Sequence, residues 1–429
     1  MRVLLIADAG DGFLDVAIRA AALGHQCKIF IRRYDRWKRP IGRGLVDRVD
    51  DWRSWIRWCD ICLLEGNAVY MYEFDRWRKE GVPIIGGGTE SAAWEADRAH
   101  GMEIFKRAGI PVPEYREFTD YDAAIAYVKR RDQPFASKPS GNCDDKSLSY
   151  VANTPEELVY MLERWKRAGK RAGLEFILQE KVSGIEFAVG GWFGPAGFAP
   201  GWEENFEHKK LMPGDLGPNT GELGTVMRLV RQSRLADWIL RPLESALQRI
   251  GYIGNIDVNC IIDEEGTAWP LEFTTRFGWP AFNIELALHS GDFISFLHSV
   301  ATGESDGMSA RALNRVACGV VLAIPDFPYS HATRKEVVGL PVWGPTDDDN
   351  WHPCEIMAGD QTEQATAGDY IGVATGIGDT VRQAVRDAYR LLDKLHIPAS
   401  PFWRNDIGVR CRRDIPHLQE HGFAVEMEY

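Results

Sequence analysis

A pair of short strands between Gly254 and Phe282 constrains the fold more than any other stretch of this chain. The segments GNIDVNCII and AWPLEFTT are joined by a short charged turn, which is the pattern of a β-hairpin. Alternation places Asp257 and Asn259 on one face of the first strand, and Glu272 and Thr274 on one face of the second. If the strands pair, Asp257 and Glu272 converge, and a partly dry site would then need a cation to neutralise them. The hairpin indicates either a site for Mg²⁺, which one or two carboxylates hold together with substrate phosphates, or a surface turn with solvated acids.

Length and composition describe an ordinary globular protein with more than one core. The chain has 429 residues, of which 45% are hydrophobic and 26% charged, and its net charge is −12. We expect two to four domains and no general affinity for nucleic acid or anionic membranes. The sequence has neither a membrane-length apolar run nor a secretory signal pattern, so we expect a cytoplasmic protein. Cys59 and Cys62 lie in a strand-like run without a second pair, which favours buried reduced thiols over a zinc site.

The N-terminal segment has the pattern that opens a doubly wound sheet. The strand RVLLIA is followed by a loop with Gly10 and Gly12, a helical pattern and a second strand, CKIFI. The loop is either a phosphate-binding turn at a helix N-terminus or a plain tight turn. We expect an N-terminal α/β domain over residues 1–95.

Residues 32–58 combine nine Arg or Lys residues with four Trp. Interleaved basic and aromatic residues can contact a phosphorylated partner or nucleic acid. The alternative, which we favour, is a solvated basic face with the Trp rings packed inward.

The middle of the chain carries a lysine and several loops suited to phosphate. Lys138 ends the predicted strand PFASKP, where a buried lysine is costly unless it meets an anion. A Gly/Ser/Asn-rich loop follows, and Glu180 and Glu186 flank a later turn. The stretch 205–224 is rich in Gly and Pro, and a loop of this length inside a compact chain is usually functional or disordered.

Six segments together resemble the phosphoribosylamine–glycine ligases, which are ATP-grasp enzymes. The segments are EHKKLMPGDLGPNTGELGTV, GIPVPEYREFTDYDAAIAYV, QEKVSGIEFAV, LEFTTRFG, VACGVVLAIPDFPY and ATGIGDTVRQAVRDAY. The resemblance covers about residues 86–395. It implies an α/β + α+β architecture: an ATP-grasp domain over residues 96–310 with a mobile lid at about 113–182, and a small C-terminal α+β domain over 311–429.

The resemblance also implies a set of site residues. Lys138, Lys209 and Arg276 are expected to be catalytic, and Asp257, Glu272 and Thr274 to hold Mg²⁺, with Mn²⁺ as the alternative ion. Thr274 stands where the family has asparagine, and Arg98 where it has an earlier lysine. The residues expected at ATP are Arg98, Lys138, Ser140, Gly141, Glu180, Lys181, Val182, Glu186, Asn219, Thr220 and Gly221.

The implied activity is a carboxylate–amine ligation through an acyl phosphate, made from ATP. The substrates would be an amino acid, glycine first, and an amine, either phosphoribosylamine or an amino-modified nucleotide or nucleobase. Three departures concentrate on the amine side: the N-terminal loop, the Arg/Trp-rich stretch, and Trp279-Pro280-Ala281 after the RFG motif. The alternative is a nucleotide-binding module that has lost catalysis. We expect a monomer or dimer without a membrane partner.

Overall fold

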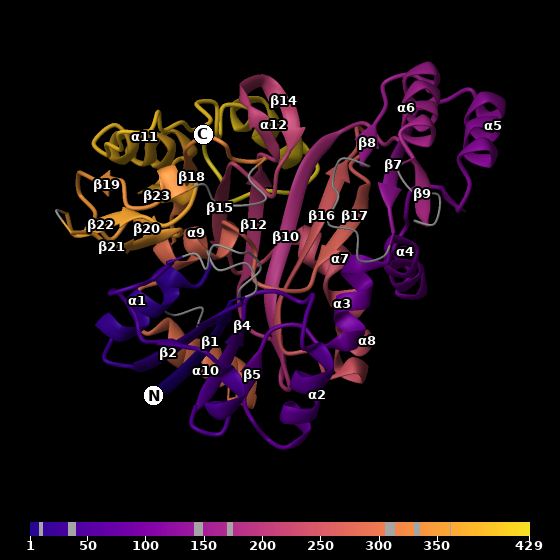
Figure 1. Ribbon diagram of the computed structural model, residues 1–429. Helices are drawn as coiled ribbons and strands as arrows, with labels where there is room; N and C mark the ends of the chain where they lie inside the picture. Colours follow the sequence, from indigo (N-terminus) through magenta and orange to yellow (C-terminus); the bar gives the residue numbers. More distant parts are fainter. Residues whose placement is uncertain are drawn as a thin grey trace.

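The computed structural model describes residues 1–7, 12–32, 40–140, 149–169, 175–304, 314–329, 335–360 and 362–429. Three larger sheets and their helices make up the molecule (Figure 1). Within the described ranges no helix is long and apolar enough to cross a membrane.

The first sheet is parallel and confirms the doubly wound opening. Its order is β3-β2-β1-β4-β5, and the run RVLLIA forms its buried centre. Cys59 and Cys62 are free, buried thiols beside it, as expected. Its elements are β1 (Arg2–Ala7), α1 (Leu14–Ala22), β2 (Gln26–Ile31), β3 (Arg48–Val49), β4 (Ile61–Leu64), α2 (Met71–Lys79) and β5 (Ile84–Ile85).

The described part of the Arg/Trp-rich stretch packs against this sheet. Trp52 is fully buried, and Arg53 forms an ion pair with Glu73 at 2.6 Å. Lys28 lies 3.9 Å from the centre of the Trp55 ring. These contacts support the inward packing of Trp that we favoured, whereas residues 33–39, which carry Arg33, Arg36, Lys38 and Arg39, lie outside the described ranges.

A second, four-stranded sheet with two helices forms a separate lobe, at the upper right of Figure 1. Its order is β6-β9-β7-β8, and Asp120 and Thr154 cap its two helices by accepting backbone N–H bonds. This lobe has its own hydrophobic cluster, separate from the main core. Its elements are β6 (Tyr115–Phe118), α5 (Tyr121–Arg131), β7 (Phe135–Pro139), β8 (Tyr150–Val151), α6 (Pro155–Arg167) and β9 (Phe176–Glu180).

The third sheet is the centre of the molecule and contains the predicted hairpin. Its main path is β17-β16-β10-β12-β15-β18-β23-β20, with β11 paired to β10. Its strands are β10 (Ile185–Gly194), β11 (Gly197–Phe198), β12 (Trp202–Glu207), β15 (Gly224–Val230), β16 (Gly254–Ile262), β17 (Ala268–Thr274), β18 (Val316–Ala323), β20 (Trp351–Pro353) and β23 (Tyr370–Gly378).

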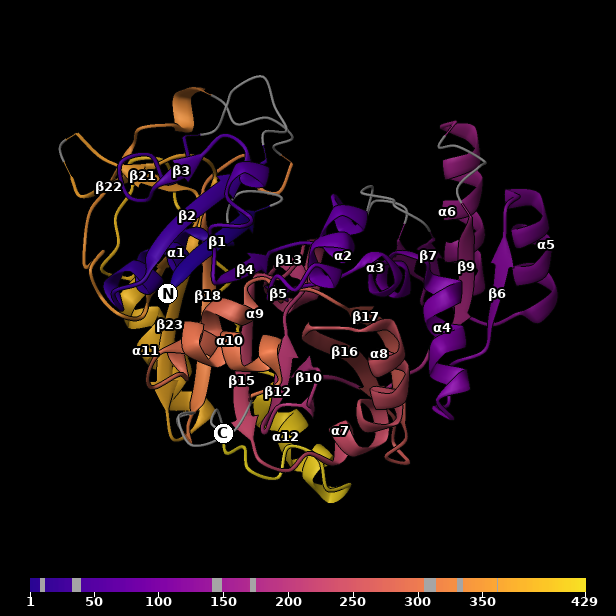
Figure 2. The ribbon, with the colours of Figure 1, turned by 90° about the horizontal axis from the view of Figure 1, so that it is seen from below.

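Two helices cover opposite faces of one end of this sheet. A Cβ on Gly319 of β18 would meet Ile284 of α9 (Ala281–Ala287), whereas one on Gly376 of β23 would meet Ala384 of α11 (Val381–Leu392). The strands β18 and β23 belong to the same sheet as β16, so the described part of this sheet continues past the expected domain boundary at residue 310. That boundary stays a prediction. Figure 2 shows these layers from below.

The remaining elements connect or cover the sheets. They are α3 (Thr89–Ala96), α4 (Arg98–Arg107), β13 (Lys210–Met212), β14 (Leu216–Asn219), α7 (Arg234–Ile239), α8 (Glu244–Ile250), α10 (Phe293–Thr302), β19 (Pro341–Val342), β21 (Ile356–Ala358), β22 (Gln364–Thr366) and α12 (Cys411–Glu420). Two pairs of consecutive helices are separated by a single residue or a short turn. Asp97 ends α3 and caps α4, and Pro242 lies in a 3₁₀ turn between α7 and α8, where it cannot supply a helical N–H bond.

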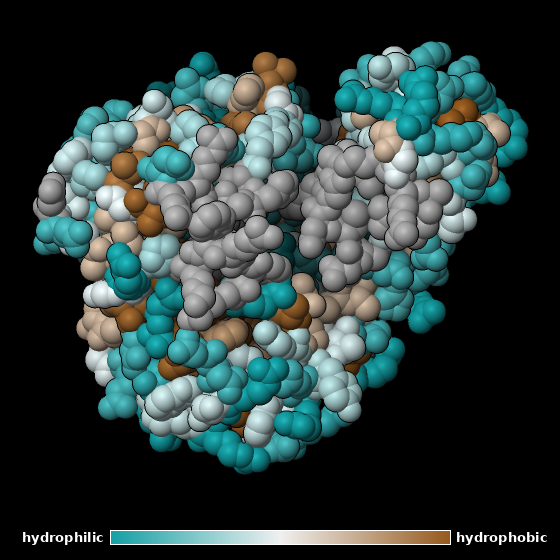
Figure 3. Space-filling view, viewed as in Figure 1, coloured by the Kyte–Doolittle hydropathy of each residue, from teal (hydrophilic) through white to brown (hydrophobic). Residues whose placement is uncertain are grey.

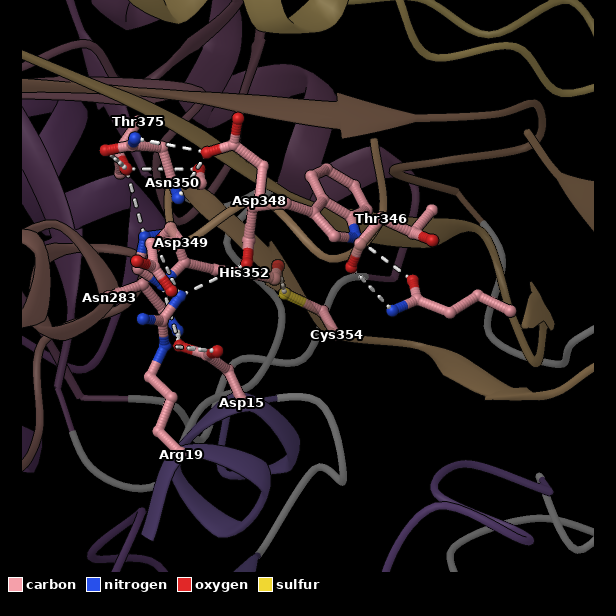
Figure 4. Close-up of polar contacts among 12 residues, drawn as sticks. Asp15, Arg19, Asn283, Thr346, Asp348, Asp349, Asn350, His352, Cys354 and Thr375 are labelled. Atoms are coloured by element: carbon pink, nitrogen blue, oxygen red, sulfur yellow. Dashed lines mark hydrogen bonds and ion pairs between the residues drawn. The ribbon is translucent and has the colours of Figure 1, made fainter. Parts of the chain in front are cut away.

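A buried polar network joins the first sheet's helix to the end of the central sheet (Figure 4). His352 Nδ1 lies 2.7 Å from Asp15 Oδ2 of α1, and its Nε2 lies 3.0 Å from Thr375 Oγ1. Arg19 contacts Asp15 at 2.6 Å and donates to the backbone oxygen of Asp349. The network fixes segments that are more than 330 residues apart in the sequence.

Candidate active site

A dense group of charged side chains lines a cavity of about 360 Å³ where the four-stranded lobe meets the central sheet. Figure 3 shows the lobe standing apart from the main body beside this region. Of the predicted site residues, the cavity is lined by Arg98, Lys138, Lys209, Asn219, Thr220, Gly221, Asp257, Glu272, Thr274 and Arg276.

Glu272 is directed into the cavity because Phe273, the next residue of β17, is buried in the core. Phe273 stacks on Phe105 of α4, with ring centres 4.0 Å apart, and packs against Trp94 of α3. This packing places Arg98, in the first turn of α4, at 2.7 Å from Glu272 Oε2. The packing of Phe273 in the core therefore sets the positions of both Glu272 and Arg98.

Lys209 reaches Glu272 from the loop between β12 and β13, and Lys138 reaches the neighbouring Leu271 from the lobe. Lys209 Nζ lies 3.3 Å from Glu272, 3.0 Å from Glu186 and 3.2 Å from Glu207. Lys138 Nζ, from β7 of the lobe, donates to Gln179 Oε1 at 2.9 Å and to the Leu271 backbone oxygen at 3.3 Å. Lys138 is thus the direct polar contact from the lobe to the predicted metal hairpin.

The charges shift one another's pKa values in opposite directions. Burial alone would raise the pKa of Glu272, but Arg98, Lys209 and Lys138 outweigh it and lower that pKa well below its usual range. Burial would lower the pKa of Lys209, but Glu186, Glu207 and Glu272 raise it well above its usual range. Burial dominates at Lys138 and lowers its pKa to about 8.

The hairpin pairs as predicted, but its register separates the two predicted metal acids. Asn259 lies opposite Glu272, and Asp257 lies opposite Thr274. Asp257 Oδ2 accepts from Asn205 of β12 at 3.1 Å, on the side away from β17. Asp257 and Glu272 thus line the same cavity, but they belong to neighbouring cross-strand pairs and do not lie opposite each other.

Arg276 is held by an acid from α3. Glu95 lies 3.1 Å from Arg276 Nε and also accepts from the Thr275 backbone and Asn67 Nδ2. The Glu95 carboxylate raises the pKa of Arg276. A smaller neighbouring cavity of about 250 Å³ continues from Arg276 and Gly221 to an aromatic wall of Phe13, Trp279 and Phe282.

The predicted adenine-hinge residues Glu180, Lys181 and Val182 are not among the residues that line the cavity. Glu180 accepts from Arg131 at 2.7 Å and from Gln133, and Lys181 Nζ donates to Asn153 at 2.8 Å. Val182 is half-buried beside them. Glu186 contacts the charged cluster through its ion pair with Lys209 at 3.0 Å.

The predicted phosphate loop is described only at its ends. Ser140 is buried, its N–H donates to the Glu175 backbone oxygen, and its Oγ has no hydrogen-bond partner. Gly141 lies outside the described residues.

Sequence reasoning assigned no role to several residues that the cavity brings together. They are Asn67, Glu95, Glu203, Glu207, Glu222 and Asn259, together with Asn205 behind them. The signal for three of them is the alternation of Glu203, Asn205 and Glu207 along β12, which puts all three on one face.

Among the described residues, several oxygens and one guanidinium nitrogen around the cavity have neither a hydrogen-bond partner nor an ion pair. These buried atoms are Arg98 Nη1, Ser140 Oγ, Asn205 Oδ1, Asp257 Oδ1 and Asn259 Oδ1. Buried polar atoms are normally paired, so this set fits a polar ligand. Carboxylate and amide oxygens also fit Mg²⁺.

Comparisons with known proteins identify the region around the cavity. Residues 96–281 match the model of the phosphoribosylglycinamide synthetase ATP-grasp (A) domain. The phosphoribosylamine–glycine ligase of Salmonella typhimurium is 29% identical over 351 residues, which are 79% of this chain and 80% of that protein.

Solved structures agree on the fold. A Thermotoga maritima phosphoribosylamine–glycine ligase superposes with a TM-score of 0.73 at 18% identity, covering 95% of this chain and all of that one. A Campylobacter jejuni biotin carboxylase gives 0.67 at 13% identity, covering 98% and 97%.

Proposed function

Because this chain is an ATP-grasp protein related to the phosphoribosylamine–glycine ligases, we propose that it joins an amino acid to an amine at the expense of ATP. ATP-grasp proteins use ATP and a divalent metal ion, and the metal proposed here is Mg²⁺. The observation that carries the proposal is the convergence of Arg98, Lys138 and Lys209 from three separate segments on the region of Glu272.

The charge balance of the cavity supports a nucleotide with a metal ion. Arg98 and Lys209 already face carboxylates, whereas no ion pair of Lys138 is found in the described part of the chain. ATP phosphates would therefore pair with Lys138 and bring further negative charge beside Glu272. Mg²⁺ held by Glu272, with the oxygens of Asn259, Thr274 and Asp257 as candidate ligands, would neutralise that charge when bound.

The side chains suit a ligation through an acyl phosphate. A carboxylate oxygen attacks the γ-phosphorus and ADP leaves; the amine then attacks the acyl carbon and phosphate leaves with that oxygen. Lys138, Lys209 and Arg98 would orient the phosphates, and Arg276, fixed by Glu95, would hold the carboxylate in line. The Asn219–Gly221 loop, whose Thr220 donates to the Lys209 backbone oxygen, would help to exclude water.

Two substrate pairs follow. The names of the relatives support glycine with phosphoribosylamine. The departures at the acceptor side support an amino acid with a different amine. The Trp279 ring lies tilted against Tyr370, with ring centres 5.1 Å apart. The Gly12 N–H donates to Glu65 at 2.6 Å, so a carboxylate already occupies that side of the aromatic cavity.

A nucleotide-binding module without catalysis remains the alternative, favoured by Thr274 and by Arg98 in place of lysine. The test is ADP release from Mg·ATP with glycine and other amino acids, each paired with phosphoribosylamine and other candidate amines. A pair that stimulates release and yields an equal amount of amide supports the ligase. Tight ATP binding without stimulation by any pair supports the binding module.

A further inference from the structure

The two-stranded β13–β14 hairpin carries residues of the cavity at its base (Figure 1, label β14). In the described part of the chain, its strands pair with each other and with no other strand. Lys209 directly precedes β13, and Thr220 and Gly221 directly follow β14. All three residues line the cavity, so their positions depend on this hairpin.

The β13–β14 hairpin has little packing of its own to fix its shape. An isolated two-stranded hairpin is marginally stable at best in water. Met212 and Leu216 are 50% and 64% exposed, so few apolar contacts hold the strands. The turn between them contains Gly214 at φ 69° and Asp215 at φ 55°, and a residue other than glycine is uncommon in that region. Contacts with another part of the chain hold this turn.

A segment near the C-terminus provides those contacts. Arg404 Nη1 donates to the Lys210 backbone oxygen at 3.0 Å, and its Nη2 donates to Asp215 Oδ1 at 2.8 Å. Asp406 Oδ2 accepts from the Gly214 N–H at 2.8 Å and from Arg404 Nη2 at 3.0 Å. Arg404 is only 2% exposed, so its guanidinium group is a buried link between the two segments.

The same segment holds the chain just before Lys209. The Gly408 N–H donates to His208 Nε2 at 3.2 Å. Arg410 Nη2 donates to the Glu207 backbone oxygen at 2.5 Å. Contacts from this segment therefore reach the chain on both sides of Lys209. We call the following four residues the C-terminal clamp: Arg404, Asp406, Gly408 and Arg410.

The C-terminal clamp is itself fixed by α11. Tyr389 of this helix donates to the Arg404 backbone oxygen at 2.8 Å and accepts from the Ile407 N–H at 3.1 Å. A Cβ on Gly408 would lie 2.7 Å from Val385 of the same helix, so the backbone of the clamp packs closely on α11. Because α11 covers the central sheet, the clamp joins the β13–β14 hairpin to that sheet.

Lys209 lies where these contacts meet. Its backbone oxygen accepts from the N–H and the hydroxyl of Thr220, both at 2.8 Å. Its ammonium group contacts one carboxylate on each of three strands, those of Glu186, Glu207 and Glu272, at 3.0, 3.2 and 3.3 Å. A small shift of its backbone would therefore change which acids the ammonium group contacts and where it meets a ligand.

Resting on the ligase function above, we propose that the C-terminal clamp positions Lys209 for the phosphates of ATP. Arg404 and Asp406 hold the β13–β14 hairpin, and the hairpin holds the backbone of Lys209. None of the four clamp residues is among those that line the cavity. They are positioning residues, and Lys209 is the group that meets the nucleotide.

The test measures nucleotide affinity, because a contact that only stabilises the fold leaves the affinity of the folded protein unchanged. Calorimetry on the full chain uses Mg²⁺ and a non-hydrolysable ATP analogue. Arg404→Lys keeps the charge but loses the planar fork that reaches three acceptors. Asp406→Asn keeps the size of the side chain but removes its charge. Each variant should raise the Kd at least about fivefold, because Lys209 no longer makes its charge-assisted bond in place.

Arg228→Lys is the matched control. Arg228 is also nearly buried, and it donates to Asn314 at 2.8 Å. It forms an ion pair with Glu426 at 3.4 Å, so it too joins the central sheet to the end of the chain. This variant should leave the Kd within about twofold of the parent's.

A double-variant cycle assigns the effect to Lys209. Lys209→Gln should weaken binding by itself. Adding Arg404→Lys to it should change the Kd by less than about twofold, because the clamp then has no ammonium group to position. A full additive loss in the double variant would overturn the proposal. If Lys209→Gln abolishes binding, the single variants decide alone.

A Kd within about twofold of the parent's in either Arg404→Lys or Asp406→Asn would also overturn the proposal. So would an equal loss of affinity in Arg228→Lys, or a parent that does not bind the analogue. If Arg404→Lys does not fold, Asp406→Asn decides.

The result is separable from the ligase test, because binding of the analogue needs no turnover. Weakened binding by the clamp variants, without product formation by the parent, removes the ligase function and keeps the clamp. Product formation by the parent, with unchanged affinities in the clamp variants, keeps the ligase function and removes the clamp.

Discussion

Glu272 is the single residue on which the charge arrangement of the cavity depends. Arg98 at 2.7 Å and Lys209 at 3.3 Å face it directly, and Lys138 contributes a third positive charge. Its lowered pKa keeps it ionised throughout the working pH range. Removing this charge leaves Arg98 without the carboxylate that it faces and deprives the metal of its proposed ligand.

Glu272→Gln should therefore lower turnover at least about a hundredfold, because charge stabilisation at the transferring phosphoryl group is lost. Steady-state ADP release measures this. Glu265→Gln, at the exposed turn of the same hairpin, is the control and should retain normal rates. Near-normal turnover in Glu272→Gln would mean that the metal lies elsewhere.

Lys138 should make ATP affinity depend on pH. Its pKa is lowered to about 8, so its ammonium form is full below that pH and is lost as the pH rises through it. The Kd for Mg·ATP should rise about tenfold between pH 7.5 and 9. Lys138→Arg keeps its charge over this range, so its Kd, although different in absolute value, should stay nearly constant. A pH profile of Lys138→Arg that parallels the parent's would assign the effect to another group.

At the scale of the elements, the four-stranded lobe packs as a unit of its own. Its hydrophobic cluster, which includes Phe135, Leu158 and Leu162, is separate from the core beneath the central sheet. Lys138 projects from this lobe toward Leu271, so nucleotide binding would involve both units. This arrangement is consistent with the expected lid, whose boundaries stay a prediction.

Leu162→Ala should loosen the lobe without unfolding the central sheet. Leu162 is fully buried in the lobe, and its truncation should lower the lobe's stability by about 2–5 kcal/mol. Hydrogen exchange should then accelerate in α5 and α6 and remain slow in β10 and β16. Val159→Ala, at the half-buried edge of the same cluster, should have a smaller effect. Equal acceleration in both sheets would show that they unfold together.

Some elements can be predicted from the local sequence pattern, whereas others depend on how the strands pair. The helix over Pro155–Arg167 has its capping threonine and N-terminal proline in the sequence, and alternation correctly places Asp257 and Asn259 on one face. The pairing of Asn259 with Glu272 depends on a register shift at Cys260, which the residue pattern does not reveal. The grouping of Glu203 with Asp257 was missed for a related reason, since it forms only when β10 lies between β12 and β16.

At the scale of the whole molecule, the Asp15–His352–Thr375 network joins the first sheet to the central one (Figure 4). No local pattern indicates a contact between residues 15 and 352, so only the fold reveals it. Burial would raise the pKa of Asp15, but His352 and Arg19 outweigh it and lower that pKa below 3.8. The network supports the aromatic cavity, because Asn283 of α9 also donates to Asp15, at 3.3 Å.

Asp15→Asn should lower the free energy of unfolding by about 2–4 kcal/mol, because it removes one member of a buried charged network. A carboxyl group with a lowered folded pKa stabilises the fold above its unfolded pKa and loses that contribution as the pH falls. The difference between parent and variant should thus be full near pH 6 and narrow below pH 3.8. Denaturant unfolding measures it, with exposed Asp347→Asn as the control; a difference that does not depend on pH would contradict this role.

The ligase mechanism is tested most directly by following carboxylate oxygen. The amino acid that stimulates ADP release is labelled with ¹⁸O in its carboxylate and turned over with Mg·ATP and its amine. The account predicts that each phosphate released carries one ¹⁸O atom, because that oxygen attacks the γ-phosphorus and leaves with phosphate when the amine attacks. Phosphate that takes its new oxygen from water instead would contradict the acyl-phosphate ligation and indicate simple ATP hydrolysis.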